Sequence, residues 1–159
     1  MLTTSAILLT LFILNLGTAF GAGLYETIII IPKWFPRSVG AGYTVDLAAM
    51  REIDSGRKFW AAVTTMPLTL LTFANLYFAA QAPQPAHDWW LAAALITLAE
   101  RISTFSFFIP TIIKLQNVSS FPPSKVHSKV ALWTRLNYVR CTLNLIAWIL
   151  AIEALALYF

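Results

Sequence analysis

Long apolar stretches separated by short polar segments fill almost the whole chain. The apolar stretches cover residues 5–31, 59–81, 89–112 and 131–158. An α-helix needs roughly 20 apolar residues to cross the hydrocarbon core of a bilayer, and each stretch is long enough to do so. The pattern predicts an all-α, polytopic membrane protein in which residues 1–159 form a single domain, a bundle of four transmembrane helices.

Proline residues mark the ends and bends of these helices. Pro32 follows the first apolar stretch, and the proline-containing segment 82–86 makes a tight link between the second and the third. Pro67 and Pro110 lie inside the second and third stretches, where a proline removes a backbone hydrogen bond. We therefore expect a kink in the second helix, unless neighbouring groups satisfy the freed carbonyl, and a bend near the end of the third.

The first long loop contains a short amphipathic segment, residues 44–53. Its apolar side chains can face the membrane while its charged side chains face water. The apolar set is Val45, Leu47, Ala48 and Ile53, and the polar set is Asp46, Arg51, Glu52 and Asp54. We expect a short interfacial helix here, and a plain ordered loop is the alternative.

Composition and charge agree with a membrane location. Hydrophobic residues make up 58% of the chain and charged residues only 11%, against about 25% charged residues in soluble domains. The net charge of +4 reflects basic residues concentrated in the loops 32–58 and 113–130. Membrane topology and anionic lipid headgroups explain this clustering more simply than nucleic acid binding does. Both loops are therefore predicted to be cytoplasmic, with both termini outside an inner or plasma membrane.

Cysteine and histidine are too sparse for the common redox and metal sites. Cys141 is the only cysteine, which excludes an internal disulfide, a paired-thiol redox centre and a thiolate metal site. His87 and His127 both lie in loops, so no helix pair offers two axial imidazoles for an intramembrane haem. We expect neither a metal nor a cofactor.

Charged residues inside the apolar stretches are the strongest functional signal. A charge within a membrane helix costs about 2.5–3.5 kcal/mol on insertion scales, so each needs a partner, a cavity or a purpose. Glu26 lies in the first helix, where it either pairs with Lys33 near the interface or serves a site. Glu100 and Arg101 lie near the middle of the third helix. Adjacent residues point about 100° apart, so we expect at least one of them to reach another helix.

The fourth helix carries the clearest pattern. Its polar and aromatic residues follow one stripe at helical spacing, and they are Trp133, Asn137, Arg140, Asn144 and Trp148. Two amides and a guanidinium cannot face lipid at acceptable cost, so this stripe is expected to face the interior of the bundle.

These residues are expected to line one polar and aromatic pocket for a hydrophobic small molecule. Glu26, Glu100 and Arg140 are its candidate charged residues, and a buried carboxylate such as Glu100 can act as a base or proton carrier. The candidate substrate-binding residues are Tyr25, Arg101, Trp133, Asn137 and Asn144. The alternative is a satisfied polar network that only fixes the register of the helices, with separate structural ion pairs.

Small residues in the first helix indicate close helix packing. Gly17 and Gly21 form a GxxxG motif, which allows two helix backbones to approach closely. Packing within the bundle is the simpler interpretation, and a homodimer through Gly17 and Gly21 is the other.

Three segments resemble the anthrone-oxygenase-like family of small four-helix membrane proteins. Trp133-Thr-Arg-Leu-Asn137-Tyr-Val-Arg140-Cys-Thr resembles the family's W-x3-N/H-x2-R-T signature, although Cys141 separates the arginine from the threonine. The segment from Gly21 to Pro32 is similar to its glycine-rich first helix, and the segment from Phe108 to Asn117 to its third-helix exit.

The resemblance implies oxidation of an anthrone to an anthraquinone without metal or flavin. It places Trp133, Asn137 and Arg140 in the pocket, with Glu26 or Glu100 as base and Arg140 with Asn137 holding an oxyanion. Two other classes stay open: a non-catalytic membrane subunit or scaffold, and a small proton-coupled multidrug transporter. Membrane lipids are the expected surroundings in every case.

Overall fold

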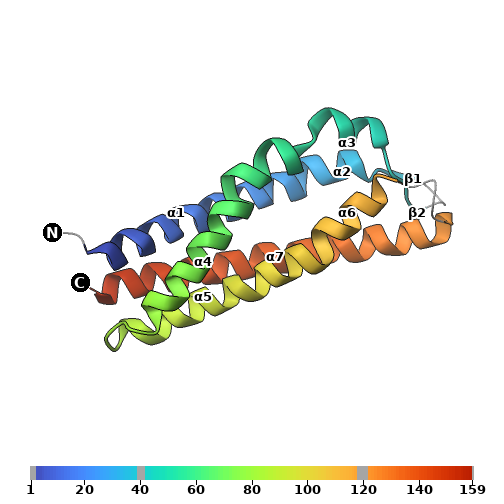
Figure 1. The fold of residues 1–159 in the computed structure, drawn as a ribbon. Coiled ribbons are helices and arrows are strands. Elements are labelled where there is room, and N and C mark those ends of the chain that lie inside the picture. The colour runs from blue at the N-terminus through green and yellow to red at the C-terminus, as the bar shows by residue number, and fades with distance from the viewer. Residues whose placement is uncertain (1–2, 39–41, 118–121, 159) are drawn as a thin grey trace.

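The computed structural model describes residues 3–38, 42–117 and 122–158. Within these ranges four helices are long and apolar enough to cross a membrane: Thr4–Trp34, Lys58–Ala79, Ala86–Leu115 and Lys125–Tyr158. The prediction of an all-α membrane protein with four spans is therefore confirmed. Figure 1 shows both termini at the same end as the turn between α4 and α5, with the two long loops at the other end. Which end is cytoplasmic stays a prediction.

The first three spans combine α-helical and π-helical segments. The first span comprises α1 (Thr4–Tyr25), η1 (Glu26–Ile30) and α2 (Ile31–Trp34). The second comprises η2 (Gly56–Thr65) and α4 (Met66–Ala79). The third comprises α5 (Ala86–Ser103), η3 (Thr104–Phe108) and α6 (Ile109–Leu115), where η denotes a π-helix. The fourth is α7 (Pro123–Tyr158), one uninterrupted α-helix.

Each π-helical segment ends two residues before a proline. The prolines are Pro32, Pro67 and Pro110, each in the first turn of the α-helix that follows. The residue before each proline donates its N–H five residues back, as Met66 does to the carbonyl of Ala61. Because proline has no N–H and its ring crowds the preceding turn, a widened turn keeps the chain helical there. The expected disturbances at Pro67 and Pro110 thus take the form of π-turns.

A side chain satisfies the carbonyl that Pro67 leaves free. An α-helix would bond the N–H of residue 67 to the carbonyl of Val63, which proline cannot do. Asn15 Nδ2 of α1 donates to Val63 O at 2.9 Å instead. The second span can therefore carry a proline inside the membrane because the first span replaces the missing donor.

The first long loop folds over the end of the bundle. β1 (Arg37–Ser38) pairs antiparallel with β2 (Gly42–Tyr43), a short pairing that the sequence pattern did not predict. α3 (Leu47–Ile53) follows, and Asp46 caps it by accepting a hydrogen bond from the N–H of Ala49 at 2.9 Å. The short helix expected in the first loop is therefore present.

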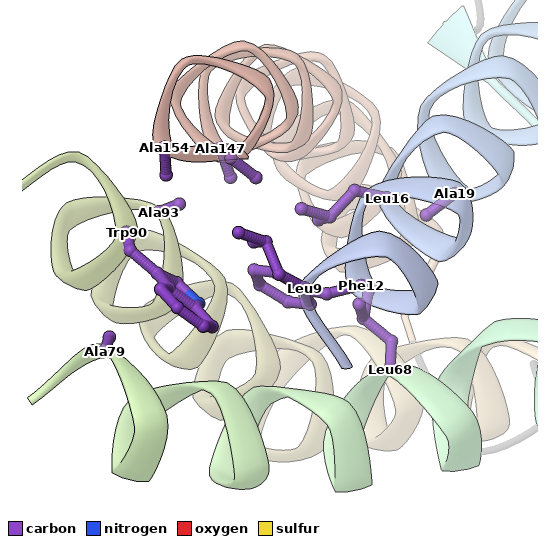
Figure 2. Close-up of a cluster of buried hydrophobic side chains, with 11 residues drawn as sticks. Leu9, Phe12, Leu16, Ala19, Leu68, Ala79, Trp90, Ala93, Ala147 and Ala154 are labelled. Atoms are coloured by element: carbon purple, nitrogen blue, oxygen red, sulfur yellow. The ribbon is translucent and has the colours of Figure 1, made fainter. Parts of the chain in front are cut away.

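Two apolar clusters hold the spans together, one at each end. Figure 2 shows the cluster at the end with the termini, where Leu9, Phe12 and Leu16 of α1 project between the other helices. Small residues of α7, such as Ala147 and Ala154, let α1 and α5 approach closely. The loop-end cluster contains side chains of α2, α3, α6 and α7, together with Phe35 after α2 and the last residue of η3. Its members are Ile31, Trp34, Phe35, Met50, Phe108, Leu115, Val126, Val130 and Trp133.

The two glycines of the GxxxG motif have different surroundings. A Cβ on Gly17 would lie 3.0 Å from Cε2 of Trp148 on α7. At Gly21 no described atom lies within 4 Å of such a Cβ. Gly17 therefore serves packing within the bundle, and a homodimer, the alternative interpretation, would have only the Gly21 side of the motif open.

This difference gives a test with a matched control. Gly17→Leu should destabilise the protein by about 1–3 kcal/mol, because the added side chain overpacks the contact with Trp148. Gly21→Leu should leave the thermal unfolding temperature in detergent unchanged. An equal loss in both variants would instead indicate a partner helix over Gly21.

Candidate functional site

A cavity of about 560 Å³ lies between the two apolar clusters. This volume falls within the range of about 300–1,000 Å³ for small-molecule sites. All four spans contribute to its walls, and the three π-helical segments supply many of the lining residues. The polar and charged lining residues include Glu26, Ser55, Thr64, Arg101, Thr104, Arg140 and Asn144, and the aromatic ones are Trp34, Trp60, Phe108 and Trp133.

Glu26, the first residue of η1, lines the cavity, and its two carboxylate oxygens make different contacts. Ser55 Oγ donates a short hydrogen bond to Oε1, and Trp60 Nε1 donates to the same oxygen at 2.7 Å. Oε2 lies 3.9 Å from Arg140 Nη2, which is an ion-pair distance longer than a hydrogen bond. Glu26 is buried. One oxygen is therefore fixed in place, and the other is held only loosely.

Arg140 lies on the inward stripe of α7 and opposite Glu26. Its guanidinium carbon is 4.7 Å from the centroid of the Phe108 ring and 5.8 Å from that of Trp60. A cation over aromatic faces is stabilised by the ring quadrupoles, more strongly where water is excluded. The guanidinium therefore stays beside the cavity without a close hydrogen bond to Glu26.

Glu100 and Arg101 form an ion pair with each other. Arg101 Nε donates to Glu100 Oε2 at 2.6 Å, and Nη2 contacts the same oxygen. Thr104 Oγ1 donates to the other carboxylate oxygen at 3.0 Å. The expectation that one of these two residues reaches another helix is wrong, because the long arginine side chain folds back along its own helix.

Three buried polar atoms on the cavity wall have no hydrogen-bond partner among the described residues. They are Nε1 of Trp34, Nη1 of Arg101 and Oδ1 of Asn144. All three residues line the cavity and are more than nine-tenths buried. Because an unsatisfied buried polar atom is costly, two donors and an acceptor left open on the cavity wall indicate a polar ligand group.

The remaining predicted residues fall into two places. Trp133 lines the cavity and donates its indole N–H to the carbonyl of Phe108 at 3.3 Å. Asn137 is fully buried behind the wall, where its Nδ2 donates to Thr27 Oγ1 at 2.6 Å and joins α7 to the first span. Glu100 also lies behind the wall rather than among the lining residues.

Tyr25, a predicted substrate-binding residue, lies outside the cavity. Its side chain is 60% exposed and does not line the cavity. Tyr25 precedes Glu26 directly, so the turn that brings the carboxylate inward sends the phenol ring outward.

The sequence pattern did not predict Ser55 and Trp60 as site residues, although both hold Glu26. A tryptophan at the end of an apolar stretch is typical of the membrane interface, so Trp60 gave no clear signal. Ser55 lies in a loop by pattern and reaches Glu26 only through the fold. The nearby Pro67 was the available signal, because a disturbed helix turn often marks a functional site.

Carboxylates and imidazoles do not gather as a metal site in the part of the chain that the structure describes. No group of three or more His, Cys, Asp or Glu side chains there could hold a metal ion. The cavity polar groups are instead a carboxylate, two guanidiniums, an amide and hydroxyls.

A family model described as anthrone oxygenase matches residues 57–150, which is more than half of the chain. The chain belongs to the anthrone oxygenase family. No curated protein and no solved structure matches it. The residues matched to the anthrone oxygenase model include Trp60, Arg101, Arg140 and Asn144, whereas Glu26 lies before the matched region. The family resemblance inferred from the residues is thus confirmed, and the role of Glu26 rests on its geometry.

The Glu100–Arg101 pair should act mainly on stability. Glu100→Gln leaves the Arg101 guanidinium buried without a counter-charge, and we expect a loss of about 3–5 kcal/mol. The double variant Glu100→Gln/Arg101→Met removes both charges and should recover much of that loss. Thermal unfolding in detergent measures both. If the double variant were as unstable as the single one, the pair would not be the source of the effect.

Proposed function

We propose that this protein is an oxygenase-like membrane enzyme that oxidises an aromatic or lipid-like small molecule without a metal or flavin. One observation carries the proposal: a carboxylate and a guanidinium, Glu26 and Arg140, lie 3.9 Å apart on the wall of a ligand-sized cavity with aromatic lining. Membership of the anthrone oxygenase family supports the reaction class.

The first step requires a base, and Glu26 is better placed for it than Glu100. Its Oε1 is fixed by Ser55 and Trp60, while Oε2 has only the long contact with Arg140. Both oxygens of Glu100 are engaged by Arg101 and Thr104. In this proposal Oε2 of Glu26 removes a proton from a methylene group that is flanked by aromatic rings and conjugated to a ketone.

The resulting electron pair delocalises onto the ketone oxygen, where Arg140 is the nearest candidate to stabilise negative charge. A preorganised cation in a water-excluded site stabilises a developing oxyanion more strongly than it would in water. The Phe108 and Trp60 rings keep the guanidinium in the cavity while leaving its N–H groups available to the substrate.

Molecular oxygen serves as the oxidant. The carbanion forms a carbon–oxygen bond with O2, and Glu26 returns its proton to the distal oxygen. Loss of the second methylene proton then breaks the oxygen–oxygen bond, releases water and leaves a carbonyl group. The substrate thus loses two hydrogens and gains one oxygen, while one O2 is consumed and one water is formed. Glu26 ends the cycle as a carboxylate.

Replacing the base tests the proposal. Glu26→Gln preserves size and hydrogen bonding but cannot accept the proton, so anthrone oxidation should fall by at least about 100-fold. The conservative control is Glu153→Gln on the exposed side of α7, which should oxidise anthrone like the wild type. Anthraquinone absorbance, corrected for spontaneous oxidation, measures the rate.

Two results would contradict different parts of the proposal. Wild-type activity in Glu26→Gln would remove Glu26 from the role of base. Failure of the wild-type protein to exceed spontaneous oxidation of anthrone would remove this substrate. Co-purification of a stoichiometric partner from mild detergent would then favour a membrane subunit.

A further inference from the structure

The second and third spans are packed together at only one end. Their main contact is between α4 and α5, near the turn that joins them, whereas η2 packs mainly against α1. Figure 1 shows the second span running obliquely from the level of α3 down to α5. The loop-side halves of these two spans, η2 and α6, therefore diverge.

The cavity reaches the protein surface along this divergence. Its lining includes Ala61 and Thr65 of η2 and Ile109, Ile112 and Ile113 of α6. Ala61 is exposed, and Ile113 is 52% exposed. Both residues lie near the loop-side ends of helices that are long and apolar enough to span a membrane, so their exposed surfaces are expected to face the lipid. The cavity thus has an apolar mouth between two candidate spans.

The buried polar part of the cavity wall has the opposite character. Arg101 Nη1 offers a buried donor and Asn144 Oδ1 a buried acceptor, neither with a partner among the described residues. Arg140 adds a second cation there. A ligand that satisfies these atoms must carry an acceptor oxygen and a donor group such as a hydroxyl at one end.

We infer that the cavity takes its ligand directly from the bilayer, through a lateral portal between η2 and α6 that is bordered by Ala61 and Ile113. The ligand class is a lipophilic amphiphile whose apolar body passes the portal and whose hydroxyl-bearing end binds Arg101 and Asn144. This inference rests on the proposed function only in taking that ligand as the substrate. Entry from water past Asp54 and Gln116, which also line the cavity, is the rival route.

The native cysteine allows the route to be measured without any oxidation assay. Cys141 is the only cysteine of the chain, and it lines the cavity. The protein in lipid nanodiscs is labelled with N-pyrenyl maleimide, which partitions into the bilayer, or with a sulfonated maleimide that stays in water. We expect the pyrenyl reagent to label Cys141 much faster than the sulfonated one.

A tryptophan at the portal should slow this labelling. Ala61→Trp is expected to reduce the pyrenyl labelling rate about tenfold, equivalent to an added barrier of about 1.4 kcal/mol. Ala62→Trp is the matched control, because Ala62 is also exposed but does not line the cavity. Ile113→Trp, with Ile102→Trp as its control, repeats the test from the α6 side if the first variant does not fold.

The possible outcomes separate the two routes. Equal labelling by both reagents, or no slowing in either portal variant, would overturn the lateral route. Thr64→Cys in a Cys141→Ala background provides a second buried target on the cavity wall. Failure of the pyrenyl reagent to label either target would contradict an open portal. Because labelling needs no turnover, a failure of the oxygenase proposal would not change the labelling result. A failure of the lateral route would likewise not change the anthrone oxidation result.

Discussion

Backbone hydrogen bonding inside the membrane is the constraint on which this structure depends. No water is available there to satisfy a free carbonyl, so a proline within a span requires compensation from its surroundings. The first three spans each contain such a proline and respond with a widened π-turn just before it. The side chain of Asn15 supplies the donor that Pro67 lacks. The cavity lies at the level of these widened turns, because the spans cannot pack there as regular helices do.

The two ion pairs that the structure describes within the spans differ in distance and in the elements they join. The Glu100–Arg101 pair is close, local to one helix and reinforced by Thr104. A buried pair of this kind tolerates little change, because removing one partner leaves a buried charge. Glu26 and Arg140 come from different spans and are 3.9 Å apart, with aromatic rings holding the cation. Because other residues orient Glu26 and Arg140, the facing atoms of both side chains stay available to a substrate.

Helical spacing in the sequence predicts the site best on α7, the described span without a π-turn. On α7 the helical spacing placed Trp133, Arg140 and Asn144 on the cavity wall correctly, since α7 keeps one period throughout. Each π-turn changes the angular register, so the periodicity of an α-helix cannot be extended through it. Tyr25 was expected in the site beside Glu26, but adjacent helix residues point in different directions, and its side chain is exposed. The contacts of Ser55 and Trp60 with Glu26 join distant segments and depend on tertiary structure alone.

The regular span α7 and the three spans with π-turns contribute different groups to the site. α7 packs in both apolar clusters, so its inward stripe is held at both ends and presents Arg140 and Asn144 in fixed positions. The facing groups Glu26, Trp60 and Phe108 come from η1, η2 and η3, whose geometry depends on the neighbouring prolines. Divergence of η2 from α6 follows from the same irregularity, because a span that changes direction cannot follow its neighbour along its whole length. One backbone feature therefore accounts for the cavity, for the convergence of its polar groups and for its open side.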